Sequence, residues 1–551
     1  MALKWLIHTA KKYIPAIVVI TLINAVYALI SVLLALFCKG IIDSAVAGKR
    51  EEMLTYAAGM AAIIMLAFII RIVSNNLTEM VRVKLEILFR NKITSQLAHK
   101  EYSQIGKIHS GELMNRLFND VQIVSNSFAT IVPGVVTLSV KTICAVSVLF
   151  VLSPKFTIVL FVGGIIFVAV TAILRGRMKS LHKNVQEKAG VVRSFLQEML
   201  ESILIVKVFS AEDVMESRSE ELHSDYYKAH IRKRRISIFA GAGIGIAFEA
   251  AYMAALVTGA SGLIAGTMTY GTLTAVLQLV NQIQQPLMNL SGYLPRYYSM
   301  IASTERIMEI EQLADESETL NDEKYIDVYE NQLPKSIIFK DVDFSYDRNV
   351  ILSNVNAEVN AGDFVAITGI SGGGKSTMFL LMMAAYKPMA GSVDIVFDNG
   401  EKMNACKETR KFFSYVPQGN YLFSGTLRDN ITIWSKEVDE AKLKLSLEIA
   451  CADKFIEELP EGLETLVGER GFGLSEGQVQ RIAIARAIYS GAPVLLLDES
   501  TSALDEETEL KVLRNISGLE GKTCFIVTHR KAAIQFCNKH FILKDSEIAN
   551  L

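Results

Sequence analysis

The chain has 551 residues, 51% of them hydrophobic, and carries a formal net charge of −2 at pH 7. This length is too great for one compact core, and the hydrophobic excess lies mostly before residue 300, which predicts a membrane domain followed by a soluble domain. The near-zero charge excludes a global basic field for nucleic acid, and the six cysteines form no CxxC pair that would indicate a zinc site.

Six apolar stretches are long enough to cross a hydrocarbon core of about 30 Å. They are residues 14–38, 54–73, 128–152, 156–174, 237–262 and 273–294. The gaps after the second and fourth stretches are long and rich in Lys and Arg, so the positive-inside rule places them, with both chain ends, in the cytoplasm. Both gaps lack proline and show helical spacing of apolar residues, which predicts helices that continue well beyond the bilayer.

Polar side chains inside these stretches are candidates for a cargo path, because polar groups are costly in a bilayer. In the sixth stretch, four amide side chains recur at helical spacing and share one face. The candidate cargo-facing residues are Asn24, Tyr27, Lys141, Glu249, Tyr252, Gln278, Gln282, Gln285 and Asn289. The alternative for each of them is hydrogen bonding between helices, and Lys141 with Glu249 is a possible pair. The amide-rich face favours a polar or amphipathic cargo such as a peptide.

An acidic segment at 312–336 has few aliphatic residues and is interpreted as a linker. The predicted domains are therefore a transmembrane domain at 1–311, the linker at 312–336 and a soluble domain at 337–551. In the soluble domain, short apolar strands such as "FVAI" and "VLLLD" alternate with helices and glycine turns, which predicts a parallel α/β core. These patterns predict a polytopic α-helical membrane domain joined to an α/β domain.

A phosphate-binding loop is predicted where residues 369–376 match GxxxxGK[ST] between an apolar strand and a helical run. Its glycines let backbone N–H groups surround phosphate oxygens, Lys375 reaches the β and γ phosphates, and Ser376 binds magnesium. A plain glycine turn is the alternative, which the strand and helix context disfavours. The predicted nucleotide-binding residues are Gly369, Ser371, Gly372, Gly373, Gly374, Lys375, Ser376 and Thr377, with ATP and Mg²⁺ as cofactors.

A second motif, "PVLLLDES", ends an apolar strand with Asp498 and Glu499. A buried strand delivers a carboxylate at its end to the sheet edge near the phosphates. Asp498 suits the magnesium shell, and Glu499 is placed to polarise water against the γ-phosphate. The alternative is an acidic cap of a helix or turn.

The segment "LSEGQVQRIAIARA", Leu474 to Ala487, resembles the signature of ATP-binding cassette (ABC) transporters. The family's other motifs stand in order: Tyr346, where the family stacks adenine, Gln418 in "YVPQGN", "TLVGERG" at 465–471, "SALD" at 502–505 and His529 in "VTHR". Six spans with two long cytoplasmic loops before one cassette resemble an exporter-type half-transporter. The fold class is therefore a polytopic α-helical membrane domain joined to an α/β P-loop NTPase cassette. The resemblance implies a helical signature subdomain, a catalytic role for His529 and Gln418, Gln418 as a magnesium ligand, and a nucleotide contact for Asp505.

The resemblance also implies that two cassettes close head to tail, with each ATP between one phosphate loop and the other chain's signature. The helix N-terminus with Ser475, Gly477 and Gln478 is a ready anion site, which suggests a partner's phosphate. Glu476 replaces the family's usual glycine, and we expect it to point away from that phosphate. Because Glu499 and His529 are both present, a homodimer is preferred over a heterodimer.

Two cytoplasmic segments resemble the family's transmission segments, in which a short transverse helix docks on a cassette. They are "GKIHSGELMNRLFNDV" at 106–121 and "ESILIVKVFSAED" at 201–213. Ordinary solvated helix is the alternative for both.

The resulting prediction is an ATPase that drives export of a peptide, drug or lipid-like cargo by alternating access, in a bacterial plasma membrane. Its predicted partners are a second half-transporter, membrane lipid and the cargo, without nucleic acid. An importer of metal–siderophore type on the same fold is one alternative, and an ATP-gated channel or regulator of a partner is another.

Overall fold

The structure, a computed structural model, describes the backbone of residues 1–551 except 291, 317–331, 348, 420–421, 469–472, 545 and 551. Side chains are described for these residues except 155, 159–175, 179, 240, 244, 285–290 and 550. The chain forms two compact units. The first comprises Met1–Gln96 and Ser110–Gln312, and the second comprises Leu97–His109 and Leu313–Leu551. Most of the predicted linker lies outside the described residues, and the predicted domain limits stay predictions.

The first unit is helical. Its elements are α1 (Ala2–Thr9), η1 (Lys11–Tyr13), α2 (Ile14–Val46), α3 (Arg50–Leu97), α5 (Ser110–Asn115), the π-helical turn η2 (Arg116–Asp120), α6 (Val121–Leu152), α7 (Pro154–Glu201), α8 (Ile203–Val208), α9 (Glu212–Ile264), α10 (Tyr270–Leu290) and α11 (Tyr293–Gln312). Helices α3 and α7 each have 48 residues and α9 has 53. At 1.5 Å per residue they are roughly 70 to 80 Å long, far more than a bilayer core. The predicted extension of the helices beyond the bilayer is confirmed.

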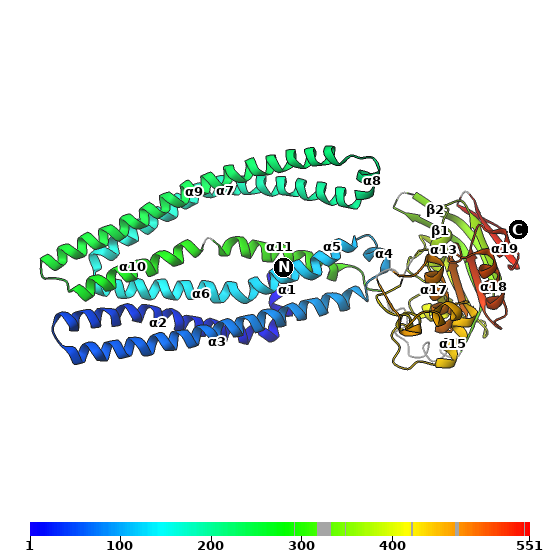
Figure 1. Cartoon of the computed structure of the whole chain (residues 1–551), viewed down its shortest axis with the longest axis horizontal. Coiled ribbons are helices and arrows are strands. Elements are labelled where there is room, and N and C mark those ends of the chain that lie inside the picture. The colour runs from blue at the N-terminus through cyan, green and yellow to red at the C-terminus, as the bar shows by residue number, and fades with distance from the viewer. Residues whose placement is uncertain are drawn as a thin grey trace. The chain divides into compact units, whose positions relative to one another are not determined.

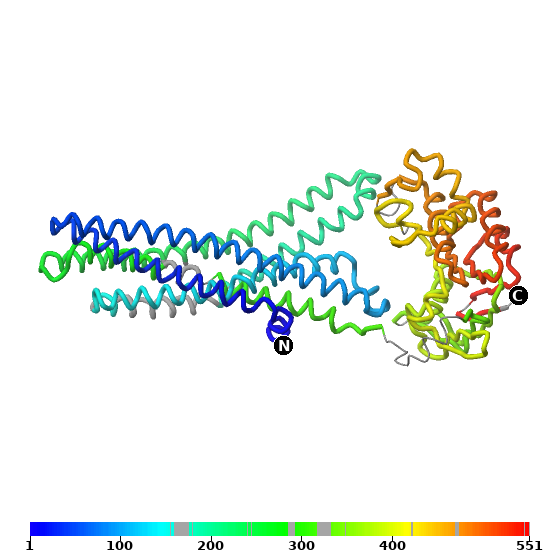
Figure 2. Tube along the Cα trace, turned by 90° about the horizontal axis from the view of Figure 1, so that it is seen from below, coloured from blue at the N-terminus to red at the C-terminus, as the bar shows by residue number. Residues whose placement is uncertain are grey.

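Helices α2, α6 and α10 pack together, and α7 runs alongside α9. Both views show that the α7–α9 pair separates from the other helices of this unit toward its α8 end (Figures 1 and 2). A cluster of buried apolar residues joins the packed helices. It contains Val32, Ala35, Ala145, Leu149, Phe156, Ala255, Val276, Leu279, Val280 and Ile283.

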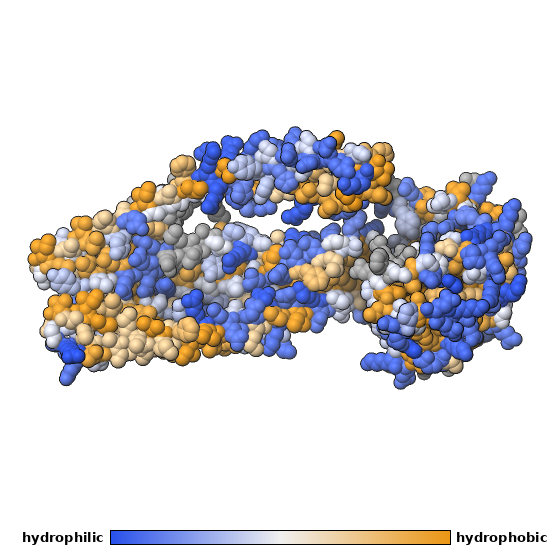
Figure 3. All heavy atoms as spheres, viewed as in Figure 1, coloured by the Kyte–Doolittle hydropathy of each residue, from blue (hydrophilic) through white to orange (hydrophobic). Residues whose placement is uncertain are grey.

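Four described helical segments are long and apolar enough to cross a membrane: Lys11–Val46, Arg50–Leu97, Ser110–Leu152 and Glu212–Ile264. They contain the first, second, third and fifth predicted spans. The fourth and sixth fall in α7 and α10, whose side chains are described only in part. Apolar residues gather at the end of this unit that carries the α2–α3 and α9–α10 turns (Figure 3).

The second unit contains two main sheets. Its strands are β1 (Pro334–Tyr346), β2 (Asn349–Asn360), β3 (Phe364–Gly369), β4 (Ala390–Phe397), β5 (Lys402–Asn404), β6 (Phe413–Val416), β7 (Gly425–Thr426), β8 (Leu466–Val467), β9 (Val494–Asp498), β10 (Thr523–Val527), β11 (Lys539–Lys544) and β12 (Glu547–Asn550). One sheet is antiparallel in the order β2-β1-β4-β5, and the other has the order β12-β11-β3-β10-β9-β6. In the second sheet β11, β3, β10, β9 and β6 are parallel, which confirms the predicted α/β core.

Helices flank these sheets. They are α4 (Tyr102–Ile105), α13 (Lys375–Met382), η3 (Glu408–Phe412), α14 (Leu427–Thr432), α15 (Glu440–Ile449), α16 (Asp453–Glu457), η4 (Gly462–Glu464), α17 (Glu476–Ser490), α18 (Glu506–Ser517) and α19 (Lys531–Ile534). Every residue of β9 and β10 is buried, so the sheet fixes the positions of their carboxyl ends. In parallel sheets, ligands bind beyond the carboxyl ends of the strands. Here the phosphate loop follows β3, and the "PVLLLDES" motif forms β9 and the residues directly after it.

Helices α2 and α10 make a very close contact at Gly271. A Cβ atom at this position would lie 2.3 Å from the carbonyl oxygen of Lys39. Asp43 fixes the same contact, because its Oδ1 accepts the Gly271 N–H at 2.9 Å and its Oδ2 accepts the Thr269 hydroxyl at 3.0 Å. Asp43 on α2 therefore caps the first turn of α10.

We predict that Gly271→Ala lowers the thermal stability of the purified protein in lipid. The added methyl overpacks a backbone contact, which typically costs about 1 to 3 kcal/mol. The matched control is Gly241→Ala in α9, where a Cβ meets nothing within 4 Å and helix propensity favours alanine. Equal melting temperatures for the two variants would contradict the close α2–α10 contact.

Candidate functional site

The phosphate loop follows β3 and ends at α13. Gly369 has φ 150°, and a Cβ there would lie 2.5 Å from the carbonyl oxygen of Leu543, so the loop requires glycine. Gly374 is the N-cap of α13 with φ 95°. The buried Lys375 crosses the loop, and its Nζ donates to the carbonyl oxygens of Gly369 and Ile370, both at 2.9 Å. The remaining predicted residues of the loop, Ser371, Gly372, Gly373, Ser376 and Thr377, lie in this loop and the first turn of α13.

Asp498 ends β9 and is 2% exposed. Its Oδ2 accepts a hydrogen bond from the Tyr415 hydroxyl at 3.1 Å, whereas its buried Oδ1 has no partner among the described residues. Burial raises the pKa of the Asp498 carboxyl, while the Ser376 and Tyr415 hydroxyls act in the opposite direction. An unpartnered carboxylate oxygen beside a serine hydroxyl fits magnesium, which prefers hard oxygen ligands.

Glu499 lies immediately beyond the sheet, where its backbone adopts φ 49° and its N–H donates to the carbonyl of Val527 at 3.1 Å. Gln418 Nε2 donates to Glu499 Oε2 at 2.7 Å, and His529 Nε2 lies 3.9 Å from Glu499 Oε1. The structure thus brings together the three residues predicted to be catalytic. A non-glycine residue in this backbone region is held there by its surroundings and is a common feature of functional sites.

The signature segment forms the start of α17. Ser475 is the N-cap, its Oγ accepts the Gln478 N–H at 3.3 Å, and Gln478 Oε1 accepts the Ser475 N–H at 2.8 Å, which is a capping box. A Cβ on Gly477 would lie 2.9 Å from the Ala503 carbonyl oxygen, so glycine permits close contact with the "SALD" segment. Glu476 is exposed on the first turn. Its direction relative to a partner's phosphate stays a prediction.

Comparison with known proteins agrees with this arrangement. Residues 14–287 match the family described as "ABC transporter transmembrane region", and residues 352–502 match "ABC transporter". The chain is 30% identical over 464 residues to the ATP-dependent lipid A-core flippase of Desulfotalea psychrophila, covering 84% of this chain and 80% of the relative. The chain belongs to the ABC transporter family. It is a multi-pass membrane protein that hydrolyses ATP for transport.

Two further similarities support the family and the fold. The chain is 30% identical over 476 residues to ABC transporter B family member 1 of Dictyostelium discoideum, covering 84% of this chain but only 51% of that protein. The structure of a bacterial Atm1-family ABC exporter with ATP bound superposes with a TM-score of 0.78 at 21% identity, covering 98% of this chain and 94% of that one. The predicted helical membrane domain with an ABC cassette is confirmed.

The "SALD" segment of this ABC transporter is held by the signature helix. Buried Gln480 on α17 donates to the Ser502 hydroxyl at 3.3 Å and accepts the Ala503 N–H at 3.0 Å. Asp505 is the N-cap of α18 and accepts the Thr508 N–H at 2.9 Å, which lowers the pKa of Asp505. Its observed partner is therefore a helix terminus, and its predicted nucleotide contact stays a prediction.

Arg530, which follows His529, was not predicted as a site residue. Its guanidinium donates to the carbonyl oxygens of Ser502 at 2.6 Å and Leu504 at 2.9 Å, and it pairs with the fully buried Glu509 at 2.7 Å. Glu509 also accepts the Thr501 hydroxyl at 2.6 Å. Arg530 thus links the segment of His529 to the "SALD" segment, and the only sequence signal was a cation next to a motif histidine.

Tyr346 lies beside the phosphate loop at the end of β1. Its ring packs edge-on against Phe344 and Tyr386, with ring centroids 4.8 and 5.3 Å apart, and its hydroxyl is 3.4 Å from Thr377 Oγ1. The structure therefore brings this aromatic residue to the nucleotide loop. Stacking on adenine stays a prediction.

The short helix α4 lies on the cassette within the second unit. Tyr102 packs edge-on against Tyr386 with ring centroids 5.9 Å apart, and Glu101 pairs with Lys387 at 2.6 Å. These residues line a cavity of about 620 Å³. Helix α4 precedes the predicted segment 106–121, whose residues from Ser110 onward belong to the first unit. The docking role of that segment stays a prediction.

The second predicted transmission segment, 201–213, contains α8 at the end of the α7–α9 pair (Figure 1). Its apolar residues are mostly exposed, with Leu204 at 70% and Phe209 at 74%, and Val206 is buried. An exposed apolar helix on a charged loop is typical of a protein contact surface.

Three of the predicted cargo-facing residues make hydrogen bonds between helices. Asn24 accepts the Ser74 hydroxyl at 2.7 Å, and Gln278 Nε2 contacts a thiol of α2 at 3.3 Å. Gln282 Nε2 donates to the Ser31 carbonyl at 2.8 Å, while its buried Oε1 has no partner in the described part of the chain. For Asn24 and Gln278 the observed contacts are those of the structural alternative.

The other cargo-facing candidates are placed differently. Tyr27, Lys141 and Tyr252 are half-buried and Glu249 is exposed. Within the described residues, no ion pair joins Lys141 to Glu249. The side chains of Gln285 and Asn289 lie outside the described residues. A cargo role for these residues stays a prediction.

We predict that Asp498→Asn abolishes ATP turnover and yet stabilises the nucleotide-free protein at pH 7. The raised pKa means that the folded state disfavours the ionised carboxylate, so removing the charge gains on the order of 1 kcal/mol per pKa unit. The gain should fade as the pH drops below the folded-state pKa, because the parent carboxyl is then neutral too.

Thermal unfolding in EDTA at several pH values, with ATPase assays alongside, measures both effects. Asp505→Ala is the control with the opposite sign, since the pKa of Asp505 is lowered and its charge stabilises α18 at neutral pH. A lower melting temperature for Asp498→Asn at pH 7 would contradict the buried-charge interpretation.

Proposed function

We propose that this ABC transporter is an exporter half-transporter, which moves a polar or amphipathic cargo out of the cytoplasm by alternating access as a dimer. The observation that carries the proposal is the cluster of Gln418, Glu499 and His529 beside the half-satisfied, buried Asp498. This cluster supplies the carboxylates that hydrolysis requires, at the edge of the parallel sheet where the phosphate loop lies.

In this proposal each residue of the cluster has one task. Ser376, Gln418 and Asp498 would hold magnesium, which would supply positive charge to neutralise the phosphates. Lys375 leaves its loop carbonyls to contact the β and γ phosphates. Glu499 orients and polarises the attacking water, and His529 contacts the γ-phosphate. Tyr346, Ser371, Gly372, Gly373 and Thr377 complete the nucleotide contacts.

A second copy of the chain completes the site. Ser475, Gly477 and Gln478 present a helix N-terminus, which favours an anion supplied by the partner's ATP. The exposed apolar α8 offers a contact surface for the partner's cassette. Because one chain holds Glu499, His529 and an intact signature serine, a homodimer needs no other subunit, although a heterodimer with a second half-transporter uses the same surfaces.

The export direction and the cargo class rest on relatives. The flippase of Desulfotalea psychrophila is named for lipid A-core, and the structural neighbour is named an exporter. The first name favours an amphipathic cargo such as a lipid, a peptide or a drug, and the second favours export. We place the protein in the plasma membrane, with the cassette and both chain ends in the cytoplasm.

The test is ATP hydrolysis by the purified chain alone in lipid vesicles, across a panel of peptides, lipids and amphipathic drugs. We expect turnover by the parent, stimulation by one cargo class, and a loss of about 100-fold or more in Glu499→Gln, the range typical of a missing general base. Glu437→Gln, an exposed acidic residue of the same domain, is the matched control.

Vesicles of defined sidedness then decide the direction. Cargo accumulation on the side opposite the cassettes supports export, and accumulation on the cassette side indicates import, for which an iron–siderophore complex is the probe. Passive ion current on ATP binding would indicate a gated channel. Near-zero turnover by a well-folded parent would reject the homodimer and point to a partner chain.

A further inference from the structure

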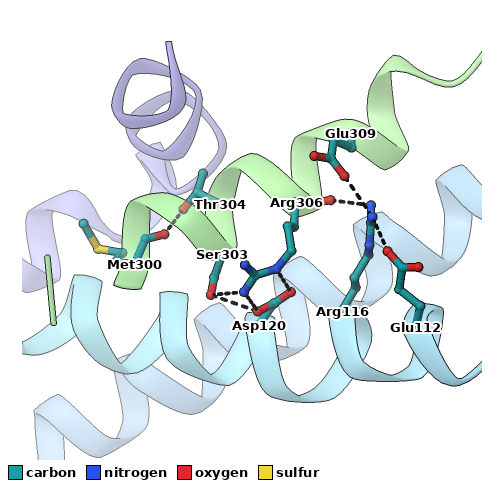
Figure 4. Close-up of polar contacts among 8 residues, drawn as sticks. All are labelled: Glu112, Arg116, Asp120, Met300, Ser303, Thr304, Arg306 and Glu309. Atoms are coloured by element: carbon teal, nitrogen blue, oxygen red, sulfur yellow. Dashed lines mark hydrogen bonds and ion pairs between the residues drawn. The ribbon is translucent and has the colours of Figure 1, made fainter. Parts of the chain in front are cut away.

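A π-helical turn, η2 (Arg116–Asp120), separates α5 from α6 in the first unit. π-Helical turns are rare and occur frequently at functional sites. Two of its residues reach across to α11 from either end of the turn (Figure 4). Their side chains are nearly fully buried, although both carry charge: Asp120 is 0% exposed and Arg116 is 7% exposed.

Asp120 binds α11 through every oxygen of its carboxylate. Arg306 Nε donates to Oδ2 at 2.8 Å, Arg306 donates a second bond to Oδ1 at 2.5 Å, and the fully buried Ser303 hydroxyl donates to Oδ1 at 2.8 Å. Arg306 also contacts the Ser303 hydroxyl at 3.1 Å. Such a two-pronged arginine–carboxylate contact fixes distance and orientation together.

Arg116 holds the next turn of α11. It donates to the main-chain carbonyl of Arg306 at 2.8 Å, and its guanidinium pairs with Glu309 at 2.8 Å and with Glu112 at 2.6 Å (Figure 4). Its buried Nε has no partner among the described residues. Helix α11 is thus held at both a side chain and a carbonyl of the same residue, Arg306.

This contact lies close to two points at which the chain passes between the two units. The polypeptide returns from the second unit to the first at Ser110, shortly before η2, and leaves the first unit again after Gln312, shortly after Arg306. Two of the covalent connections through which a cassette can pull on the helices are therefore joined to each other by Arg116, Asp120 and Arg306.

We propose that Arg116, Asp120, Ser303 and Arg306 form a joint that makes α11 and the η2–α6 segment move together when the cassette binds ATP. Asp120 and Arg306 are positioning residues for transport, and they act without touching ATP. The proposal rests on the ATP-driven conformational cycle of the proposed function.

Stability alone is a weak reason for this arrangement. Replacing a buried ion pair by apolar residues is often neutral or stabilising, because desolvation offsets the attraction. Packed elements with directional contacts also transmit motion as discrete rearrangements. A change from π to α hydrogen bonding in η2 would shift the following residues by one position along the helix, which makes the turn a suitable place for such a rearrangement.

The fluorescence of Trp5 can report movement of α11. The chain has two tryptophans, Trp5 and Trp434. The Trp5 indole donates to Glu311 near the end of α11, and its ring stacks on Phe89 of α3 with ring centroids 6.0 Å apart. Movement of α11 against α3 changes this environment, and Trp434→Phe leaves Trp5 as the sole tryptophan.

The experiment uses the full chain in lipid vesicles with Trp434→Phe and Glu499→Gln, so that bound ATP persists. We expect ATP to shift the Trp5 emission in this background, and the shift to be lost in Asp120→Asn and in the double variant Asp120→Asn/Arg306→Gln. Binding of radiolabelled ATP should be unchanged in both. Asp225→Asn is the matched control, because it removes an ion pair between α9 and α7 of 3.0 Å outside the joint, and it should keep the shift.

Every result of this experiment either supports the joint or overturns it. If Asp120→Asn and the double variant both bind ATP and keep the emission shift, the joint is only structural and the proposal fails. It also fails if the background protein binds ATP without any shift, or if neither variant folds. If Asp120→Asn alone unfolds, the double variant decides, since it removes both charges together. Export is measured separately in vesicles of Trp434→Phe protein that retains Glu499. No export there, together with a Trp5 shift in the Glu499→Gln background, would reject the proposed function and keep the joint.

Discussion

The parallel pairing of β3, β10 and β9 is the constraint on which the ATP site depends. It brings the phosphate loop after β3, the His529 segment after β10, and Asp498 with Glu499 at the end of β9 to one edge of the sheet. Because β9 and β10 are buried along their whole length, a shift of one residue would place a polar group in the core and a catalytic group out of reach. The apolar core therefore sets the positions of the residues proposed to be catalytic.

This dependence explains which parts of the site the sequence could predict. A motif directly after an apolar strand must lie at the edge of the sheet. The phosphate loop, Asp498 and Glu499 could therefore be placed from the local sequence. Gln418 and His529 needed the family resemblance, and the structure adds that both approach Glu499. Tyr415, Gln480 and Arg530 were missed, because their importance lies in contacts with residues far away in the chain.

The helical unit shows the same limit of local patterns. Apolar length and proline content predicted long helices, and the structure has helices of 48 and 53 residues. Periodicity placed Gln278 and Gln282 on one face of α10 but could not say what they face. In the structure they contact α2, so within one chain their donors serve helix packing. The packing of Tyr102 on Tyr386 was also not predicted, because a single aromatic contact between distant residues leaves no sequence motif.

Two buried aspartates differ in whether both of their carboxylate oxygens accept hydrogen bonds. Asp120 is fully buried, and both of its oxygens accept hydrogen bonds from α11, so its charge needs no further ligand, which suits the proposed joint. Asp498 is as deeply buried, but one oxygen is left without a partner in the described part of the chain, and burial raises its pKa. In the proposed function a cation at this sheet edge offsets the cost of burying the Asp498 charge, whereas the charge of Asp120 is already satisfied by α11. We therefore assign Asp498 to nucleotide binding and Asp120 to the proposed joint.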